Sequence, residues 1–132
     1  MDIIRLQGTE KKLFELVGPL VMSPAVLRQN NNYPFKTGLK YTWHIAVDHD
    51  EVAGFIPVKS TAPDSCLIDN YYIKGDDSQI LCALLEDIIE HKAAQAELWA
   101  TVHKRHVDLF SQNGFHCHVN WKKYDKMQYF PK

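Results

Sequence analysis

The chain has 132 residues and a formal net charge of -1, with 45% apolar and 23% charged residues. This size and composition predict a single globular domain spanning residues 1–132. The nearly balanced charge argues against a protein held on nucleic acid by a basic field. No apolar run approaches the length of a membrane span, and the start "MDIIRLQGTE" lacks a basic and then apolar leader pattern. We therefore expect a cytoplasmic protein that binds neither nucleic acid nor membrane.

The first third of the chain predicts one strand, two helices and a loop. "DIIRL", residues 2–6, is a short apolar strand, and Thr9 is the expected cap of the helix that follows. Ser23 before Pro24 predicts the start of a second, shorter helix. Residues 28–38 are polar and rich in turn formers, and therefore predict a loop. One face of the first helix carries apolar side chains at helical spacing: Leu13, Leu16, Val17 and Leu20.

The middle of the chain alternates with a period of two. Residues 42–60 predict a β-hairpin whose turn lies at His49-Asp50. Pro57 cannot donate to a strand ladder, so it should lie at a strand end, at a bulge or on an unpaired side. "CLIDNYYI", residues 66–73, is apolar on both faces except for two polar residues, and predicts one further long strand.

The last part of the chain predicts a crossover unit and a closing hairpin. Residues 78–94 form two apolar helical ridges, and residues 96–102 form a buried strand, which together with the preceding strand predict a right-handed βαβ crossover. Residues 104–114 predict a short helix, followed by strands at 115–121 and 126–130. The expected fold class is α/β (α+β), with a mixed, mostly antiparallel sheet, one βαβ crossover and helices on both faces.

This order of elements, over nearly the whole chain, resembles the GNAT superfamily of N-acetyltransferases. Four segments carry the resemblance: "WHIAVDHDEVAGFIPV", "CLIDNYYI", "CALLEDII" and "LFSQNGF". They are similar to the family's aromatic and acidic hairpin, its central strand, its Ala-Leu-Leu helix and its Leu-Tyr-x-x-x-Gly-Phe ending. The resemblance implies an N-acetyltransferase that moves an acetyl group from acetyl-CoA to a small-molecule or peptide amine. The alternative is a GNAT-fold binding module that has lost affinity for acetyl-CoA and is not an enzyme.

The resemblance also implies where acetyl-CoA would bind. In the family, the end of the central strand pairs with the pantetheine arm, and the turn before the helix binds the pyrophosphate with backbone N–H groups. Carried over to this chain, the cofactor residues are Tyr72, Ile73, Lys74, Gly75, Ser78, Gln79, Ile80 and Phe110. The family's phosphate-loop motif, Q/R-x-x-G-x-G/A, falls on residues 76–81 and is not matched, so we expect a degenerate loop.

Two acidic residues occupy that loop. Asp76 and Gln79 have the spacing of a capping box, in which the carboxylate accepts helix N–H groups and the amide reaches back. Such a cap contributes about 1 kcal/mol to stability, which is a structural reason for both residues. A carboxylate about 6 Å from a phosphate also repels it by roughly 1.4 kcal/mol per charge pair at an effective dielectric constant near 40. Asp76 and Asp77 are therefore expected to oppose the cofactor's pyrophosphate.

Acetyl transfer requires a base for the amine and a donor for the developing oxyanion. Asp69 on the central strand is the candidate base, and the alternative is a strand carboxylate hydrogen-bonded to a neighbour. The hydroxyl of Tyr72 is a candidate accessory group, as are Asn70 and Tyr71. Phe110 stands where the family often has a tyrosine acid and has no proton to give. His103, near the position of an asparagine common in the family, is the third candidate catalytic residue.

The seven histidines raise the question of a metal site. His116 with His118, and His103 with His106, each supply only two ligands, whereas a site needs three or four. We therefore expect no metal. Cys66, Cys82 and Cys117 have no C-x-x-C spacing, and are expected to be reduced thiols packed as small hydrophobic groups. The acceptor amine and the oligomeric state have no diagnostic pattern.

Overall fold

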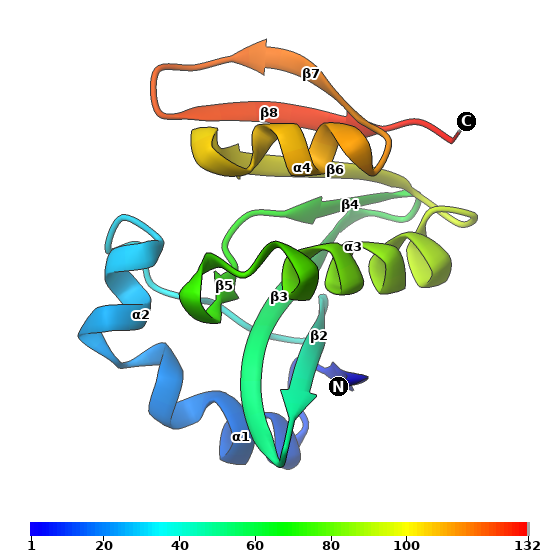
Figure 1. Ribbon diagram of the computed structural model, residues 1–132. Coiled ribbons are helices and arrows are strands. Elements are labelled where there is room, and N and C mark those ends of the chain that lie inside the picture. Colours follow the sequence, from blue (N-terminus) through cyan, green and yellow to red (C-terminus); the bar gives the residue numbers. More distant parts are fainter. Residues whose placement is uncertain (132) are drawn as a thin grey trace.

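The computed structural model describes residues 1–131 and consists of one eight-stranded sheet with helices on both faces (Figure 1). The strands follow the order β1-β2-β3-β4-β6-β8-β7, with β5 paired to β3, and every pairing is antiparallel except β4 with β6. The strands are β1 Asp2–Gln7, β2 Tyr41–Asp48, β3 Glu51–Ala62, β4 Ser65–Ile68, β5 Tyr72–Ile73, β6 Glu97–His103, β7 Phe115–Asn120 and β8 Tyr124–Tyr129. This confirms the predicted mixed sheet and its single βαβ crossover.

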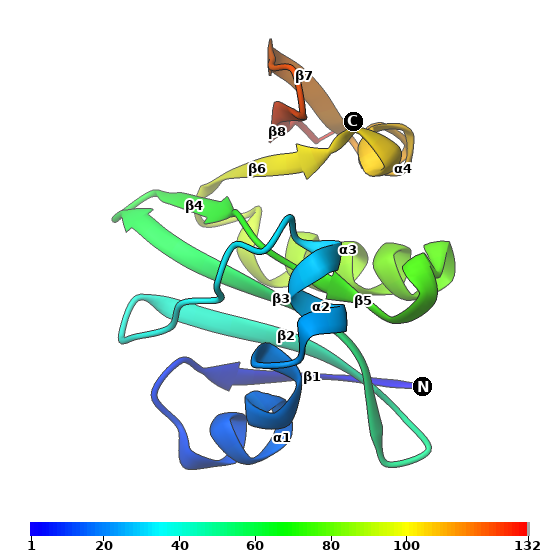
Figure 2. The same ribbon diagram turned by 90° about the vertical axis from the view of Figure 1, so that its left-hand side faces the viewer.

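The helices divide between the two faces of the sheet. They are α1 Lys11–Val21, α2 Pro24–Gln29, α3 Ser78–Lys92 and α4 Val107–Gln112, with 3-10 turns η1 Lys74–Asp76 and η2 Lys104–His106. In Figure 2, α1 and α2 lie in front of the strands, whereas α3 and α4 lie toward the right of the view. Within residues 1–131, no helix is both long enough and apolar enough to cross a membrane.

Strand alternation produces two hydrophobic clusters, one on each face. Trp43 and Ile45 of β2 and Phe55 of β3 pack against α1 and α2. The intervening positions, Ala46 and Ile56, face the other way and join the larger cluster beneath α3 and α4. Trp43 is thus a core residue.

The β2–β3 hairpin turns at the predicted dipeptide. His49 and Asp50 both adopt positive φ, at 50° and 66°. Two successive left-handed residues are the geometry of a type I′ turn, whose twist matches that of antiparallel strands. The connection therefore forms without the asparagine-glycine pair that usually provides it.

The prediction of one continuous strand over residues 66–73 is wrong. β4 ends at Ile68, and the chain resumes as β5 only at Tyr72, where it pairs with β3 instead of continuing beside β6. Pro57 and its neighbour Ile56 have no partner on this side of β3, because β4 pairs from Val58 onward. Pro57 thus lies on an unpaired side, which is one of the places that its missing N–H allows.

Several local predictions also need correction. Glu10, and not Thr9, is the N-cap residue of α1, and its side chain makes no capping bond. Asp77, and not Asp76, caps α3, and its carboxylate accepts a hydrogen bond of 2.9 Å from the N–H of Gln79. The predicted capping box therefore does not form. Of the cysteines only Cys66 is buried, while Cys117 is exposed.

Candidate functional site

The strands β4 and β6 part at their carboxyl ends. They pair in parallel over four positions, the last being Ile68 with Ala100. Beyond that pair, β6 continues to His103, while the segment that follows β4 turns toward β3 and pairs with it as β5. This divergence opens a gap in the strand pairing that side chains fill, among them Asn30 and His103, both buried. We use the word cleft for this filled region, bounded by the edge of β5, the end of β6 and the turn η2.

A side-chain amide is bound to the edge of β5 inside this cleft. The Nε2 of Gln29 donates to the carbonyl of Ile73 at 2.7 Å, and the N–H of Ile73 donates to the Oε1 of Gln29 at 2.8 Å. Both backbone groups of Ile73 point away from β3 and into the cleft, because they are paired with Gln29. A carboxamide that donates and accepts in this way takes the place of a neighbouring strand.

The end of α2 brings Gln29 to this position. Val26 is buried in the cluster beneath α1 and α2, which places the last turn of the helix over the cleft. Asn30, directly after the helix, is 2% exposed and lies 3.3 Å from His103 through its Oδ1 and the histidine Nε2. The guanidinium of Arg105 donates to the backbone carbonyl of Gln29 at 3.0 Å. The helix end is therefore bound to both walls of the cleft.

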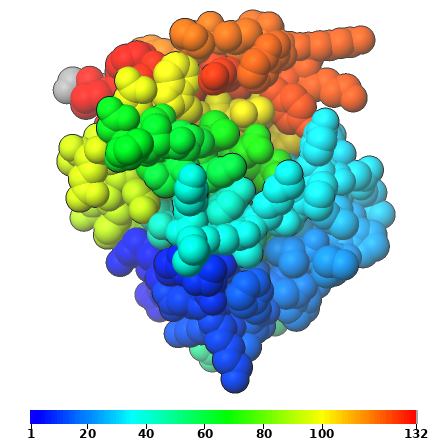
Figure 3. All heavy atoms as spheres, turned by 180° about the vertical axis from the view of Figure 1, so that it is seen from behind, coloured from blue at the N-terminus to red at the C-terminus, as the bar shows by residue number. Residues whose placement is uncertain are grey.

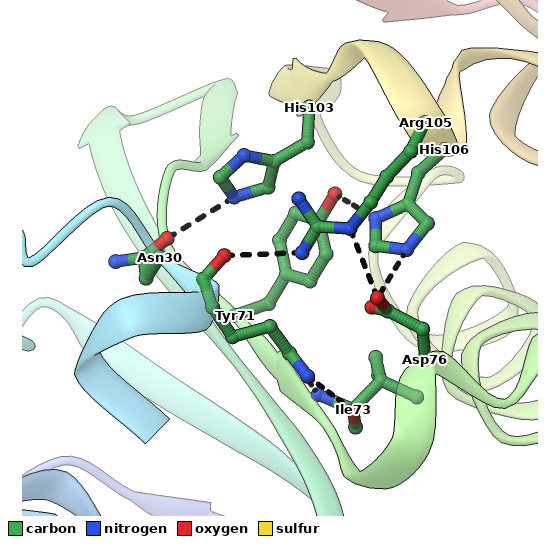
Figure 4. A network of polar contacts seen from close by, with 8 residues as sticks. Asn30, Tyr71, Ile73, Asp76, His103, Arg105 and His106 are labelled. Carbon is green, nitrogen blue, oxygen red and sulfur yellow. Dashed lines mark hydrogen bonds and ion pairs between the residues drawn. The ribbon is translucent and has the colours of Figure 1, made fainter. Parts of the chain in front are cut away.

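A second chain of polar contacts runs from the buried Tyr71 and His106 to the exposed Asp76 and Arg105 (Figure 4). The hydroxyl of Tyr71 lies 2.8 Å from the Nδ1 of His106, whose Nε2 lies 3.1 Å from a carboxylate oxygen of Asp76. Because a carboxylate only accepts, the Nε2 carries the proton and the Nδ1 accepts from Tyr71. Arg105 binds the other oxygen of Asp76 at 3.1 Å. We call these residues, with Gln29, Asn30, Ile73 and His103, the cleft network.

Burial sets the protonation states in this network. It lowers the pKa of His103 to about 4, with a further lowering from the nearby Arg105. Burial, followed by the charge of Arg105, also lowers the pKa of His106, and burial raises the pKa of the Tyr71 hydroxyl. Near neutral pH both histidines and the tyrosine are therefore uncharged. The remaining charges in the network, those of Arg105 and Asp76, compensate each other.

The amino end of α3 is occupied by the protein's own carboxylates. Asp77 accepts from the helix, as described above, and Asp76 is held by Arg105 and His106. Asp76 reaches them from a left-handed conformation, with φ of 51°, directly after Gly75 at 65°. The positive end of the helix is thus partly neutralised from within.

Beside the cleft, the face of the sheet opposite α3 carries a cavity of about 490 Å³. Alternate residues of β3 and β4 form its floor, among them Pro57, Lys59 and Leu67, and Thr101 of β6 completes it. The segment Tyr33–Lys36 forms a wall; it belongs to the loop coloured cyan, which crosses this face of the molecule in Figure 3. The remaining lining residues are Tyr41, Thr61, Asp69, Asn70 and Tyr124.

The cavity and the cleft are neighbours. Tyr124 lines the cavity, and its ring centroid lies 5.1 Å from that of His103 in the cleft network. The amide of Asn31, next to the Asn30 of the network, donates to the Tyr124 hydroxyl at 2.6 Å. A molecule in the cavity would therefore lie next to the point where β4 and β6 part.

The predicted catalytic residues do not come together at one point. Asp69 lines the cavity, but it is exposed and lies in the break after β4, not on a strand. His103 is 3% exposed and belongs to the cleft network. Tyr72 packs against Phe55, with ring centroids 5.6 Å apart, and lines neither the cavity nor the network.

The predicted cofactor residues do not share one environment. Ile73 presents its backbone to the cleft, whereas Phe110 is fully buried in the core beneath α3 and α4. Lys74 is exposed and faces Glu51, with 3.8 Å between Nζ and Oε2. Gly75, Ser78 and Gln79 lie exposed at the start of α3, and Ile80 is half-buried behind them.

The residues that sequence reasoning missed are Gln29, Asn30 and Arg105. Gln29 and Asn30 lie in a run of polar residues that predicts a loop, and their partners lie more than 40 positions away in the chain. The sequence contained one signal: Gln29 ends a short helix that Val26 anchors in the core, and a side-chain amide in such a position is able to bind a strand edge. Nothing in the sequence indicates which edge it meets.

The polar groups elsewhere in residues 1–131 include one acid and histidine cluster, formed by Asp87, Glu90 and His91 on α3. Both oxygens of Asp87 are already occupied, one by Arg5 at 2.6 Å and the other by the Nδ1 of His44 at 2.7 Å. The Nδ1 of His91 lies 2.8 Å from the carbonyl of Asp87. These contacts describe a structural ion pair that ties α3 to β1 and β2.

No protein-family model matches the sequence, and no curated protein is similar to it. Solved structures are similar in fold. Escherichia coli ElaA superposes with a TM-score of 0.71 at 12% identity, over 98% of this chain and 100% of that one. Tetrahymena GCN5 gives 0.70 at 11% identity, over 98% and 95% of the two chains.

An N-acetyltransferase from Campylobacter jejuni, PseH in complex with acetyl coenzyme A, is similar to this chain as well. It gives a TM-score of 0.63 at 16% identity, over 99% of this chain and 100% of that one. At these identities the likeness establishes the fold and not the activity. The chain has the fold of the GNAT acetyltransferases over about 98% of its length.

Proposed function

We propose that the protein is an N-acyltransferase that uses acetyl-CoA and an amine acceptor, with the cleft as its acyl-CoA site. One observation carries the proposal: the backbone edge of Ile73 points into the cleft and already binds a carboxamide, that of Gln29. The pantetheine arm of coenzyme A contains amides of the same donor and acceptor chemistry. The edge thus has the chemistry that the arm requires.

The residues present fit one end of the cofactor better than the other. The edge of β5 fits a pantetheine amide, provided that Gln29 leaves. At the amino end of α3 a pyrophosphate would meet Asp76 and Asp77, of which, within residues 1–131, only Asp76 is compensated by a charge, that of Arg105. We infer that the cofactor binds here with reduced affinity because of the uncompensated carboxylate.

When bound, acetyl-CoA supplies the acetyl group as a thioester. In the proposed reaction, Asp69 receives a proton from the ammonium group of the acceptor in the cavity. The freed amine nitrogen bonds to the acetyl carbon and the carbon–sulfur bond breaks. The nitrogen then gives up its second proton, which passes through water to the thiolate, so that an amide and a free thiol are formed. A thiol has a pKa near 8.5, so it leaves readily even though Phe110 has no proton to give.

The second candidate function is a binding module without catalysis. It is favoured by the same network, since Gln29, Asp76 and Asp77 fill the positions that a cofactor would take. Such a protein would keep the fold while its own side chains replace the ligand. The two candidates differ in whether acetyl-CoA binds and in whether it is turned over.

The first experiment is thermal denaturation with acetyl-CoA, with coenzyme A and without ligand. Ligand at 100 times its dissociation constant stabilises a fold by about 2.7 kcal/mol. Gln29→Ala removes the competing amide, and should bind acetyl-CoA roughly tenfold more tightly if the two hydrogen bonds cost about 1 kcal/mol or more to break. Gln95→Ala, an exposed position beyond the far end of α3, is the matched control.

The outcomes separate the candidates. Tighter binding in Gln29→Ala alone, together with release of free thiol when amines are added, supports the acyltransferase. Binding without thiol release for any amine supports the binding module. If millimolar acetyl-CoA changes the melting temperature of neither the wild type nor Gln29→Ala, the cleft is not an acyl-CoA site.

A further inference from the structure

We propose that the acceptor is an amine that also carries a carboxylate or phosphate group on a flat, ring-bearing body. The role of this ligand as the acetyl acceptor rests on the proposed function, whereas its chemical class is argued from the charge and shape of the cavity alone. It deepens that proposal by naming a class of substrate.

The cavity contains charges of both signs that the protein itself leaves unpaired. Lys36 and Lys59 line it together with Asp69. Within residues 1–131 none of the three has an ion-pair partner, whereas Asp76, Asp87 and Asp125 are all paired with basic side chains. Charges left free around a hollow favour a ligand that supplies the opposite charges.

The net charge of the cavity lining indicates which class of ligand it favours. With two lysines against one aspartate, the lining favours one anionic group in addition to the ammonium that Asp69 would bind. The Nζ of Lys59 lies 5.9 Å from the ring centroid of Tyr41, which holds this charge beside the cavity. Purely cationic acceptors, such as polyamines, would be repelled by the lysines.

Aromatic side chains determine the shape of the preferred body. Tyr33, Phe35, Tyr41 and Tyr124 surround the cavity from three separate segments of the chain. Aromatic walls favour flat rings through stacking and edge-to-face contacts. The hydroxyl groups of the three tyrosines add donors and acceptors, which suits a ligand that also carries polar groups.

The test uses pairs of amines that differ only in the carboxylate. Phenylalanine is compared with phenethylamine, and 4-(aminomethyl)benzoate with benzylamine. Binding is measured by ligand-observed NMR without acetyl-CoA, and turnover by thiol release with it. One unit charge pair about 6 Å apart at an effective dielectric constant near 40 corresponds to about tenfold in affinity. We expect the carboxylated member of at least one pair to bind roughly tenfold more tightly.

Charge reversal at the two lysines supplies the matched variants. Lys36→Glu with Lys59→Glu should abolish or invert the preference, while Lys11→Glu with Lys12→Glu, on the exposed surface of α1, should leave it unchanged. Equal binding within both pairs, no binding of any of the four amines, or a preference that survives the first double variant would each overturn the inference.

Failure of this inference is distinguishable from failure of the proposed function. A preference seen in binding without any thiol release keeps the cavity's class of ligand and removes the acyltransferase. Thiol release with all four amines at equal rates keeps the acyltransferase and removes the class.

Discussion

The cleft and the cavity lie side by side, yet they differ in how their polar groups are satisfied. In the cleft network, Gln29 binds Ile73, and Asp76 binds both Arg105 and His106. In the cavity, Lys36, Lys59 and Asp69 have no ion-pair partner within residues 1–131. One region is saturated by contacts within the chain, and the other is open to a ligand.

This difference separates two kinds of binding site. A ligand that enters the cleft must first displace Gln29, so its apparent affinity is reduced by the free energy of those two hydrogen bonds. A ligand that enters the cavity displaces only water. The comparison also implies that changes in the cleft affect the stability of the fold, while changes in the cavity affect only ligand binding.

Acid should lower the stability of the fold through its buried histidines, one of which, His103, belongs to the cleft network. His103 and His44 both have pKa values lowered to about 4 by burial, from 6.5 in the unfolded chain. Because the unfolded chain binds the protons first, stability is complete above pH 6.5 and falls as the pH decreases toward 4. At pH 5 each histidine costs about 2 kcal/mol, or about 4 kcal/mol together.

Denaturant unfolding at pH 7 and pH 5 measures this loss. His103→Gln removes one titrating group, and should reduce the difference between the two pH values by about 2 kcal/mol. An unchanged pH dependence in this variant would show that His103 is not neutral in the folded protein.

Removal of a single hydroxyl should cost more stability in the cleft network than at the cavity. Tyr71→Phe deletes the donor to His106 in a position that is 1% exposed, and should cost about 1–3 kcal/mol of unfolding free energy. Tyr33→Phe is the matched change at the cavity, where the side chain is 58% exposed, and should cost less than about 0.5 kcal/mol. Equal losses in the two variants would contradict the comparison.

The charge of Asp77 tests the amino end of α3. Asp77→Asn keeps an oxygen that accepts from Gln79 but removes the negative charge, so stability should change little because the two residues are similar caps. Acetyl-CoA affinity, measured by titration calorimetry, should rise several-fold, up to about tenfold. Asp77→Ala is the control for the cap itself and should lose about 1 kcal/mol of stability. Weaker binding in Asp77→Asn would show that the carboxylate does not oppose the cofactor.

A small effect is also expected at the cavity floor. Lys59→Met keeps the aliphatic stem of the side chain and removes the charge above the Tyr41 ring. Exposed cation–π contacts contribute about 0.5–1 kcal/mol at most, so the midpoint of denaturant unfolding should shift by no more than that. A larger loss would assign Lys59 a role in the fold and weaken its role in binding.

Much of this fold could be predicted from the sequence because its signals are local. The alternation in residues 42–60 and the two ridges of residues 78–94 were confirmed as the β2–β3 hairpin and α3. The break after Ile68 was missed, since "CLIDNYYI" is apolar enough to form one strand. The strand is interrupted because the chain stops pairing with β6 and pairs with β3 instead. Such a change of pairing partner produces no periodic pattern in the sequence. Gly54 allows that change, because a Cβ there would lie 2.9 Å from the carbonyl oxygen of Tyr72.

By itself the sequence determined the order of the elements apart from the break between β4 and β5, the core faces of the β2–β3 hairpin and the acidic character of the turn before α3. These follow from periodicity and residue type, which act over a few neighbouring positions. Only the tertiary structure decided which partner each polar group meets. Asp76 meets Arg105 and Gln29 meets Ile73 across 29 and 44 positions of the chain. The Gln29–Ile73 pair is part-buried, where polar groups must be satisfied, whereas the Asp76–Arg105 pair is exposed. In both cases the fold alone determines which groups are within reach.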